Sequence, residues 1–133
     1  MSADERARLL DEASGLVNGA RNGTYGEPVD DYTKVAGLWN AYITGVLARN
    51  GVDLEGLLPL EPHDAIAMMV LLKVSRIAND AGHRDNWVDI AGYAACGWDA
   101  RVDEQARLKV VSPVDRVADL HRRIVDIVGG YND

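Results

Sequence analysis

The sequence predicts an all-α domain, a compact bundle of about five helices, and three observations support this fold class. Apolar residues recur at spacings of three and four over most of the chain, which is the period of an amphipathic helix. No segment alternates apolar and polar residues for long enough to indicate a strand. Glycine, asparagine and proline residues interrupt the helical pattern where helices would begin and end.

The first two helices are predicted from their apolar stripes and from the signals that end them. Residues 4–17 form the first helix, with the apolar side chains on one side. Residues 18–28 are rich in glycine and asparagine and are expected to form a loop. The second helix runs from about residue 29 to residue 50, where an Asn50-Gly51 pair is a stop signal.

The other three helices are predicted from proline and glycine positions. The third, residues 62–81, begins with a proline, which the first turn of a helix tolerates. The fourth, residues 85–100, follows a glycine-containing turn. The fifth, residues 112–128, has a serine N-cap followed by a proline, and a glycine pair ends it. The chain is predicted to be one domain, with residues 1–101 as its core and residues 102–133 as a C-terminal helical extension.

Composition and charge exclude several classes of protein. A net charge of −7 argues against nucleic acid or an anionic membrane as the partner. The longest apolar runs fall short of the ~20 residues that a membrane span needs, and residues 1–13 are acidic and amphipathic, unlike a signal sequence. The single cysteine, Cys96, fits a reducing compartment and is expected to be a small buried hydrophobe. We therefore expect a soluble, cytoplasmic protein.

A polar strip crosses two otherwise apolar helices. The third predicted helix is apolar nearly all round, which is typical of a buried helix, and its polar side chains Lys73, Arg76 and Asp80 share one face. The fourth carries Asp85 and Asp89 on one face, four residues apart. Buried cations need anionic partners, so we expect the two strips to meet across a short helical hairpin.

Two interpretations of this arrangement stay open. In the first, Lys73 and Arg76 only neutralise Asp85 and Asp89 in a structural network. In the second, the carboxylates hold Mg²⁺, which typically uses one or two protein carboxylates together with water and substrate phosphates. Lys73 and Arg76 would then bind phosphate oxygens, the arginine in bidentate fashion and the lysine as a point charge.

Residues 21–31 have the composition of either a substrate loop or an ordinary turn between helices. As a substrate loop, it would offer Arg21 to phosphate and Tyr25 to a nucleobase. Asp31 either caps the second helix or projects along its apolar stripe toward the site. Tyr93 would hydrogen-bond a ligand or lie satisfied at the rim of the site.

Three stretches carry a resemblance to a known family: LLDEASGLVNGARNGTYGEPVDDYTKVAGLW (9–39), DAIAMMVLLKVSRIAN (64–79) and HRDNWVDIAGYAA (83–95). Spanning about residues 9–98, they resemble a family of short, uncharacterised phage and prophage proteins. More distantly, the arrangement is similar to MazG-like and nucleotide-modification-associated all-α nucleotide pyrophosphohydrolases. That wider resemblance implies a helical fold, Mg²⁺, a nucleoside triphosphate substrate, and dimers or higher oligomers.

The sequence departs from the MazG-like pattern among the metal ligands. That family carries a Glu-Glu-x-x-Glu stretch followed by Glu-x-x-Asp. Here Asp11 and Glu12 are followed by Gly15, where the third acid would fall. The stretch EPHD, residues 61–64, fits the second element, but Asp64 could equally be a helix cap, because acids favour the first turn.

The function expected from these patterns is that of a phage-type nucleotide-metabolism protein in the host cytoplasm, a Mg²⁺-dependent (deoxy)nucleoside polyphosphate pyrophosphohydrolase. Lys73 and Arg76 would stabilise charge developing on the phosphates, and would form the catalytic set together with Asp85 and Asp89. The candidate Mg²⁺ ligands are four carboxylates: Asp31, Asp64, Asp85 and Asp89. One alternative is a non-catalytic protein that binds a nucleotide or sequesters a nucleotide signal. A third possibility is a helical interaction protein whose polar network is structural.

The last predicted helix carries an apolar seam, in which Val117, Leu120, Ile124 and Ile127 repeat at spacings of three and four. The seam is too short for a freestanding coiled coil, so it must lie against another surface. That surface is either the body of the same domain or the same helix of a second subunit. Because the resembling enzymes build their sites at subunit contacts, we expect a homo-oligomer, a dimer or higher.

Overall fold

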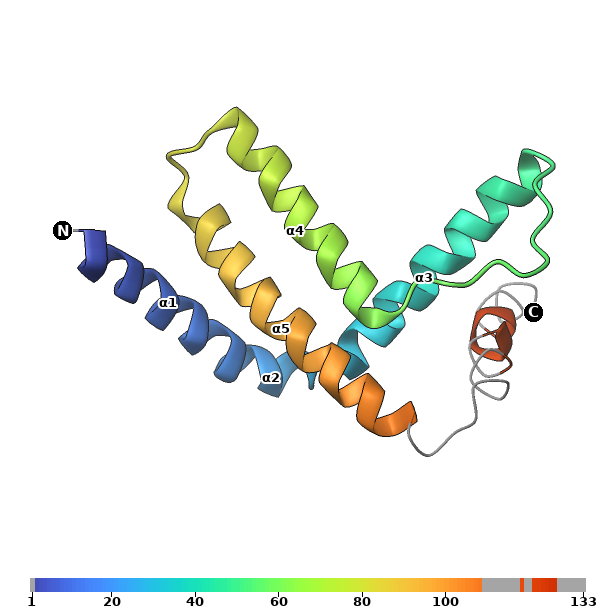
Figure 1. Cartoon of the computed structure of the whole chain (residues 1–133), viewed down its shortest axis with the longest axis horizontal. Coiled ribbons are helices and arrows are strands. Elements are labelled where there is room, and N and C mark those ends of the chain that lie inside the picture. Colours follow the sequence, from blue (N-terminus) through green and yellow to red (C-terminus); the bar gives the residue numbers. More distant parts are fainter. Residues whose placement is uncertain (1, 109–117, 119–120, 127–133) are drawn as a thin grey trace.

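The computed structural model describes residues 2–108, 118 and 121–126, and it confirms the all-α class. Strands are absent from these described residues. The helices are α1 (Ser2–Asn18), α2 (Ala20–Tyr25), α3 (Pro28–Arg49), α4 (Pro62–Asn79) and α5 (Arg84–Leu108) (Figure 1). Among the helices of the described part, none combines the length and the apolar character needed to cross a membrane.

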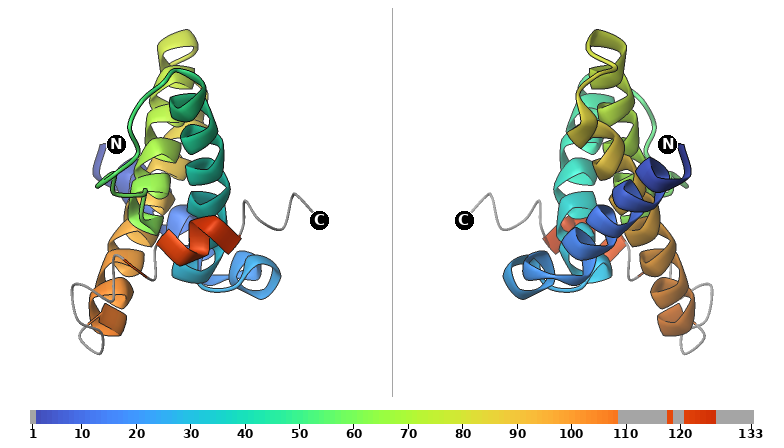
Figure 2. Two further views of the ribbon diagram at one scale, coloured as in Figure 1. Left: turned by 90° about the vertical axis from the view of Figure 1, so that its right-hand side faces the viewer. Right: turned by 90° about the vertical axis from the view of Figure 1, so that its left-hand side faces the viewer.

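Helix α5 is the centre of the bundle, since it packs against α1, α3 and α4 (Figures 1 and 2). Helices α4 and α5 form the predicted antiparallel hairpin. Its turn is closed by Asp80, whose carboxylate accepts a hydrogen bond of 2.9 Å from the Gly82 N–H. The start of α3 crosses the end of the hairpin where α4 begins, and the rest of α3 extends away from it.

The core lies where the first half of α3 meets the start of α4 and the second half of α5. Ile66 of α4 is its largest side chain with almost no exposed area. A Cβ atom at Gly97 would lie 3.3 Å from Ile66 Cγ2, so the glycine lets α5 approach α4 closely. Cys96 is buried in this core, as predicted, and burial raises the pKa of its thiol. The buried members of the cluster are Val29, Tyr32, Ala36, Ala65, Ile66, Cys96 and Ala100.

Two helix predictions were wrong in detail. Residues 18–28, expected as a loop, contain the short helix α2. A glycine costs a helix about 1 kcal/mol relative to alanine, yet the segment is helical and its Arg21 donates a hydrogen bond to Tyr32 of α3. Helix α5 continues to Leu108, past its predicted end near residue 100. Residues 101–108 contain no glycine or proline, and Arg107 pairs with Asp103 one turn away at 3.1 Å.

The prediction that the third predicted helix, α4, is buried nearly all round was also wrong for the single chain. Only Ala65, Ile66 and Lys73 of this helix are buried. Leu71 and Val74, which have large apolar side chains, are exposed. Helix α4 packs against α3 and α5, and these two neighbours cover only part of its circumference. Helical periodicity therefore identified the apolar residues but overestimated how many of them are covered.

The described part of the last predicted helix lies against its own chain. Residues 121–126 are helical, and His121 Nε2 is 3.3 Å from the Leu57 carbonyl oxygen in the connection between α3 and α4. Ile124 and Val125 share a cavity of about 310 Å³ with that connection and α3. Of the predicted seam, Val117, Leu120 and Ile127 lie outside the described residues. Homo-oligomer formation through this helix therefore stays a prediction.

Asn40 fixes the connection between α3 and α4 to α3. Its side chain donates to the Leu60 carbonyl at 2.9 Å and accepts from the Leu60 N–H at 2.8 Å. Asn40→Ala would leave the N–H and carbonyl groups of the half-buried Leu60 without these partners, and we expect the free energy of unfolding to fall by about 1–3 kcal/mol. Urea denaturation followed by circular dichroism measures this. Asn79→Ala, at an exposed asparagine, is the control, and equal effects of the two substitutions would contradict the assignment.

Candidate functional site

The predicted polar strips of α4 and α5 meet in one ion pair. Lys73 Nζ lies 2.5 Å from Asp89 Oδ2, with 10% of the lysine side chain and 26% of the aspartate side chain exposed. The pairing is possible because the two helices run antiparallel, which brings the second half of α4 beside the first turns of α5. The burial of Lys73 therefore depends on Asp89 to neutralise its charge.

The other two members of the predicted catalytic set, Arg76 and Asp85, are exposed. Within the described part of the chain, neither side chain forms a hydrogen bond or an ion pair. Asp85 nevertheless lies one helical turn before Asp89 on α5, so the two carboxylates share a face. Asp85 therefore faces solvent, whereas Asp89 is bound to Lys73.

Arg21 of α2 gathers several predicted site residues from three helices. Its guanidinium carbon lies 6.0 Å from the ring centre of Tyr25 and 5.7 Å from that of Tyr93, within cation–π range. Its Nη2 is 4.0 Å from Asp31 Oδ2 and donates a hydrogen bond of 3.0 Å to the Tyr32 hydroxyl. The fold thus brings together four predicted site residues from α2, α3 and α5: Arg21, Tyr25, Asp31 and Tyr93.

Tyr32 is the member of this cluster that sequence reasoning missed. It is buried, its ring meets Tyr93 edge to face at 6.5 Å, and burial raises the pKa of its hydroxyl to about 12. The hydroxyl therefore stays protonated at neutral pH. Its position three residues after Val29 and four before Ala36, on one face of a helix, is the signal that could have marked it as buried.

A cavity of about 150 Å³ joins the Arg21 cluster to the ion pair. Arg21, Asp89 and Tyr93 supply its polar wall, and Leu16 and Val17 of α1 supply apolar wall. Gly92 also lines it, and a Cβ there would lie 3.2 Å from Val17 Cγ1, so the glycine permits the close approach of α1 and α5. Drug-sized ligands occupy roughly 300–1,000 Å³. This cavity has room for a phosphate-sized group, with the rest of a ligand outside it.

The four predicted Mg²⁺ ligands are not gathered at one place. Asp64 accepts the Glu61 N–H at 2.8 Å in a capping box at the start of α4, the alternative role considered for it. Asp31 faces Arg21. Asp85 and Asp89 lie one turn apart on α5, and Asp89 is bound to Lys73.

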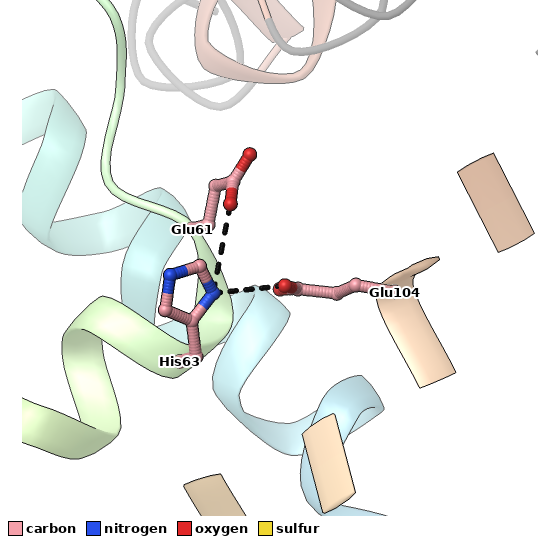
Figure 3. A group of neighbouring side chains, drawn as sticks. All are labelled: Glu61, His63 and Glu104. Atoms are coloured by element: carbon pink, nitrogen blue, oxygen red, sulfur yellow. Dashed lines mark hydrogen bonds and ion pairs between the residues drawn. The ribbon is translucent and has the colours of Figure 1, made fainter. Parts of the chain in front are cut away.

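One group of three potential metal ligands is found among the described residues, at the start of α4 and the end of α5: Glu61, His63 and Glu104 (Figure 3). Burial raises the pKa of the Glu104 carboxyl, and its hydrogen bond with His63 opposes that shift. Sequence reasoning missed the group because Glu104 lies beyond the predicted end of its helix. It shares no residue with the Arg21 cavity.

Comparison with known proteins gives a family match and phage relatives. The family described as a domain of unknown function (DUF6378) matches residues 8–101. The Gene 55 protein of Mycobacterium phage L5 is 36% identical over 86 residues, which are 65% of this chain and 47% of that protein. The Gene 55 protein of Mycobacterium phage D29 is 32% identical over 88 residues, 66% of this chain and 50% of that protein.

These relatives confirm the predicted resemblance to a family of phage proteins. The chain spans about half the length of the curated relatives it matches. No solved structure matches the chain with significance.

Proposed function

This chain belongs to the DUF6378 family, a domain of unknown function, and we propose that it binds a nucleoside polyphosphate at the Arg21 cavity. The observation that carries the proposal is the position of Arg21, which lines a phosphate-sized cavity while three tyrosine rings surround its guanidinium. A terminal phosphate would enter the cavity. The sugar and base would lie outside it, along α2.

Arg21 keeps donors for this role. A guanidinium has five N–H donors, and the structure assigns one hydrogen bond, to Tyr32, together with a 4.0 Å approach to Asp31. Tyr32 and the neighbouring rings hold the guanidinium in place, which lowers the entropy lost on binding. Tyr25, 58% exposed, offers a ring on which a nucleobase can stack.

The charge around the cavity favours a ligand that arrives with a cation. Arg21 and Lys73 contribute two positive charges, which Asp31 and Asp89 balance. A polyphosphate alone would therefore bring uncompensated negative charge next to Asp89. Mg²⁺ at Asp85 and Asp89 would supply that compensation and would polarise the phosphates.

Hydrolysis of the bound nucleotide is the finer form of the proposal, with release of pyrophosphate or phosphate. Asp85 and Asp89 would position the metal-bound substrate, and Lys73 and Arg76 would stabilise the developing phosphate charge. The alternative is binding without turnover, by a protein that sequesters a nucleotide. The exposed position of Arg76, outside the Lys73–Asp89 pair, favours this alternative. If neither holds, the Lys73–Asp89 pair is structural and the chain is a helical interaction protein.

Calorimetry with a panel of nucleoside di- and triphosphates, in Mg²⁺ and in EDTA, tests the binding proposal. We expect Arg21→Gln to weaken binding about tenfold to a hundredfold, because hydrogen bonds to charged groups contribute about 1.5–3 kcal/mol. Arg49→Gln, at an exposed arginine of α3, is the matched control and should bind like the unaltered chain. Absence of binding to every nucleotide, or equal loss in both variants, refutes the proposal.

Chromatography of the same mixtures separates turnover from sequestration. Pyrophosphate or phosphate release that disappears in Asp85→Asn supports the hydrolase. Recovery of intact nucleotide after denaturation of the complex supports the non-catalytic alternative.

A further inference from the structure

His63 stands between two carboxylates that come from different parts of the chain. Its Nδ1 lies 2.9 Å from Glu104 Oε2 and 3.5 Å from Glu61 Oε2. Figure 3 shows both carboxylates directed at this one ring nitrogen, Glu61 from the start of α4 and Glu104 from α5. One ligand atom from each residue lies within 4.8 Å of those of the other two. Such a spacing allows a single ion to contact all three.

Glu104 supplies the second, independent observation. Its side chain is only 9% exposed, yet within the described part of the chain its buried Oε1 has no hydrogen-bond partner. A buried carboxylate oxygen normally accepts at least one hydrogen bond, because losing its water without replacement is costly. The orphaned oxygen lies on the same carboxylate that contacts His63, so it points to a ligand of this group.

The side chains around His63 are mainly negatively charged, which favours a cation. Three carboxylates surround His63, because Asp64 Oδ1 lies 3.4 Å from the other ring nitrogen, Nε2. Arg101 also approaches the group, and its Nη1 is 3.7 Å from Glu61 and 3.9 Å from Glu104. A divalent ion bound among these carboxylates would be attracted by their negative charge.

We propose that Glu61, His63 and Glu104 form a binding site for a divalent transition-metal ion, Zn²⁺ or Mn²⁺. The ion would bind His63 through Nδ1, and the Nε2–H group would donate to Asp64 Oδ1, which lies 3.4 Å away, an arrangement that fixes the tautomer of many metal-bound histidines. One imidazole and two carboxylates suit these ions better than Mg²⁺, which prefers oxygen ligands alone. The site joins the start of α4 to the end of α5 and is separate from the Arg21 cavity.

The test is calorimetric titration of the full chain, stripped with EDTA and dialysed, with Zn²⁺, Mn²⁺ and Mg²⁺ separately. We expect one equivalent of Zn²⁺ or Mn²⁺ to bind more tightly than Mg²⁺. His63→Ala and Glu104→Gln should each weaken that binding at least about tenfold. Loss of a residue that only hydrogen-bonds to a metal ligand already weakens metal binding by about tenfold or more. His83→Ala, at an exposed histidine outside the group, is the matched control and should leave binding unchanged.

A second measurement needs no variant. Co²⁺ added to the stripped chain should give visible absorption bands of a protein-bound ion, and Zn²⁺ should displace them. Absence of both calorimetric binding and these bands overturns the proposal, and so does binding that survives His63→Ala but not His83→Ala.

If His63 is instead a protonated ion-pair partner of Glu104, Glu104→Gln lowers Tm with or without metal, and no ion binds. Nucleotide binding at Arg21 should persist in His63→Ala, so the two proposals can fail separately.

Discussion

Asp89→Asn is expected to lower the free energy of unfolding by about 2–3 kcal/mol. Loss of one partner of a fully buried ion pair costs about 3–5 kcal/mol, because the other charge stays buried and unpaired. The cost should be smaller here, since 26% of the Asp89 side chain reaches solvent. Guanidinium or urea unfolding gives the value, from the shift of the transition midpoint at an unchanged slope.

Two further variants make this expectation specific. Asp85→Asn makes the same substitution one turn earlier at an exposed carboxylate, and it should change stability by no more than about 0.5 kcal/mol. Combining Asp89→Asn with Lys73→Met removes the stranded ammonium and should recover most of the loss. A double variant no more stable than Asp89→Asn would show that the carboxylate acts in some way other than by neutralising Lys73.

Ile66→Ala should be the most destabilising single truncation in the core, at about 2–5 kcal/mol. Ile66 is 1% exposed and packs on Gly97, so shortening its side chain opens a cavity between α4 and α5. Neither helix can move into that space without disturbing Ala65 and Ala100, which are fully buried beside it. Thermal or chemical denaturation followed by circular dichroism measures the effect.

Ile43→Ala is the matched control for this truncation. Ile43 lies in the outer half of α3 with 37% of its area exposed, so less apolar surface returns to water when it is shortened. We expect its effect to be less than half that of Ile66→Ala. Comparable losses at the two positions would mean that the stable core extends along α3 and is not centred on the α4–α5 contact.

Local signals were enough to predict most of the helices. Pro62 begins α4, and the Asn50-Gly51 pair follows the end of α3, because these residues act on backbone geometry within a single turn. The signal failed at α2, where the glycines of residues 18–28 indicated a loop but residues 20–25 form a helix whose Arg21 contacts α3. It failed again after residue 100, where no stop signal ends α5 until at least Leu108.

Periodicity also identified which faces would carry the polar residues, but it could not choose partners across helices. The strips of Lys73 with Arg76 and of Asp85 with Asp89 were visible in the sequence. Only the fold shows that Lys73 pairs with Asp89 while Arg76 and Asp85 face solvent. The period of a helix gives the direction of each side chain around its axis, whereas pairing depends on how far one helix slides along the other.

The sequence by itself determined the all-α class, the hairpin of α4 and α5, and the faces that carry charge, because each depends on residues within one or two turns. The tertiary structure alone decided that Tyr32 holds Arg21 and that Glu104 reaches His63, which lies 41 residues earlier in the chain. Gly92 and Gly97 in turn permit close approaches of α5 to α1 and to α4, because a Cβ atom at either position would crowd the neighbouring helix. The offset and separation of packed helices depend on all the side chains between them, so no local pattern encodes them.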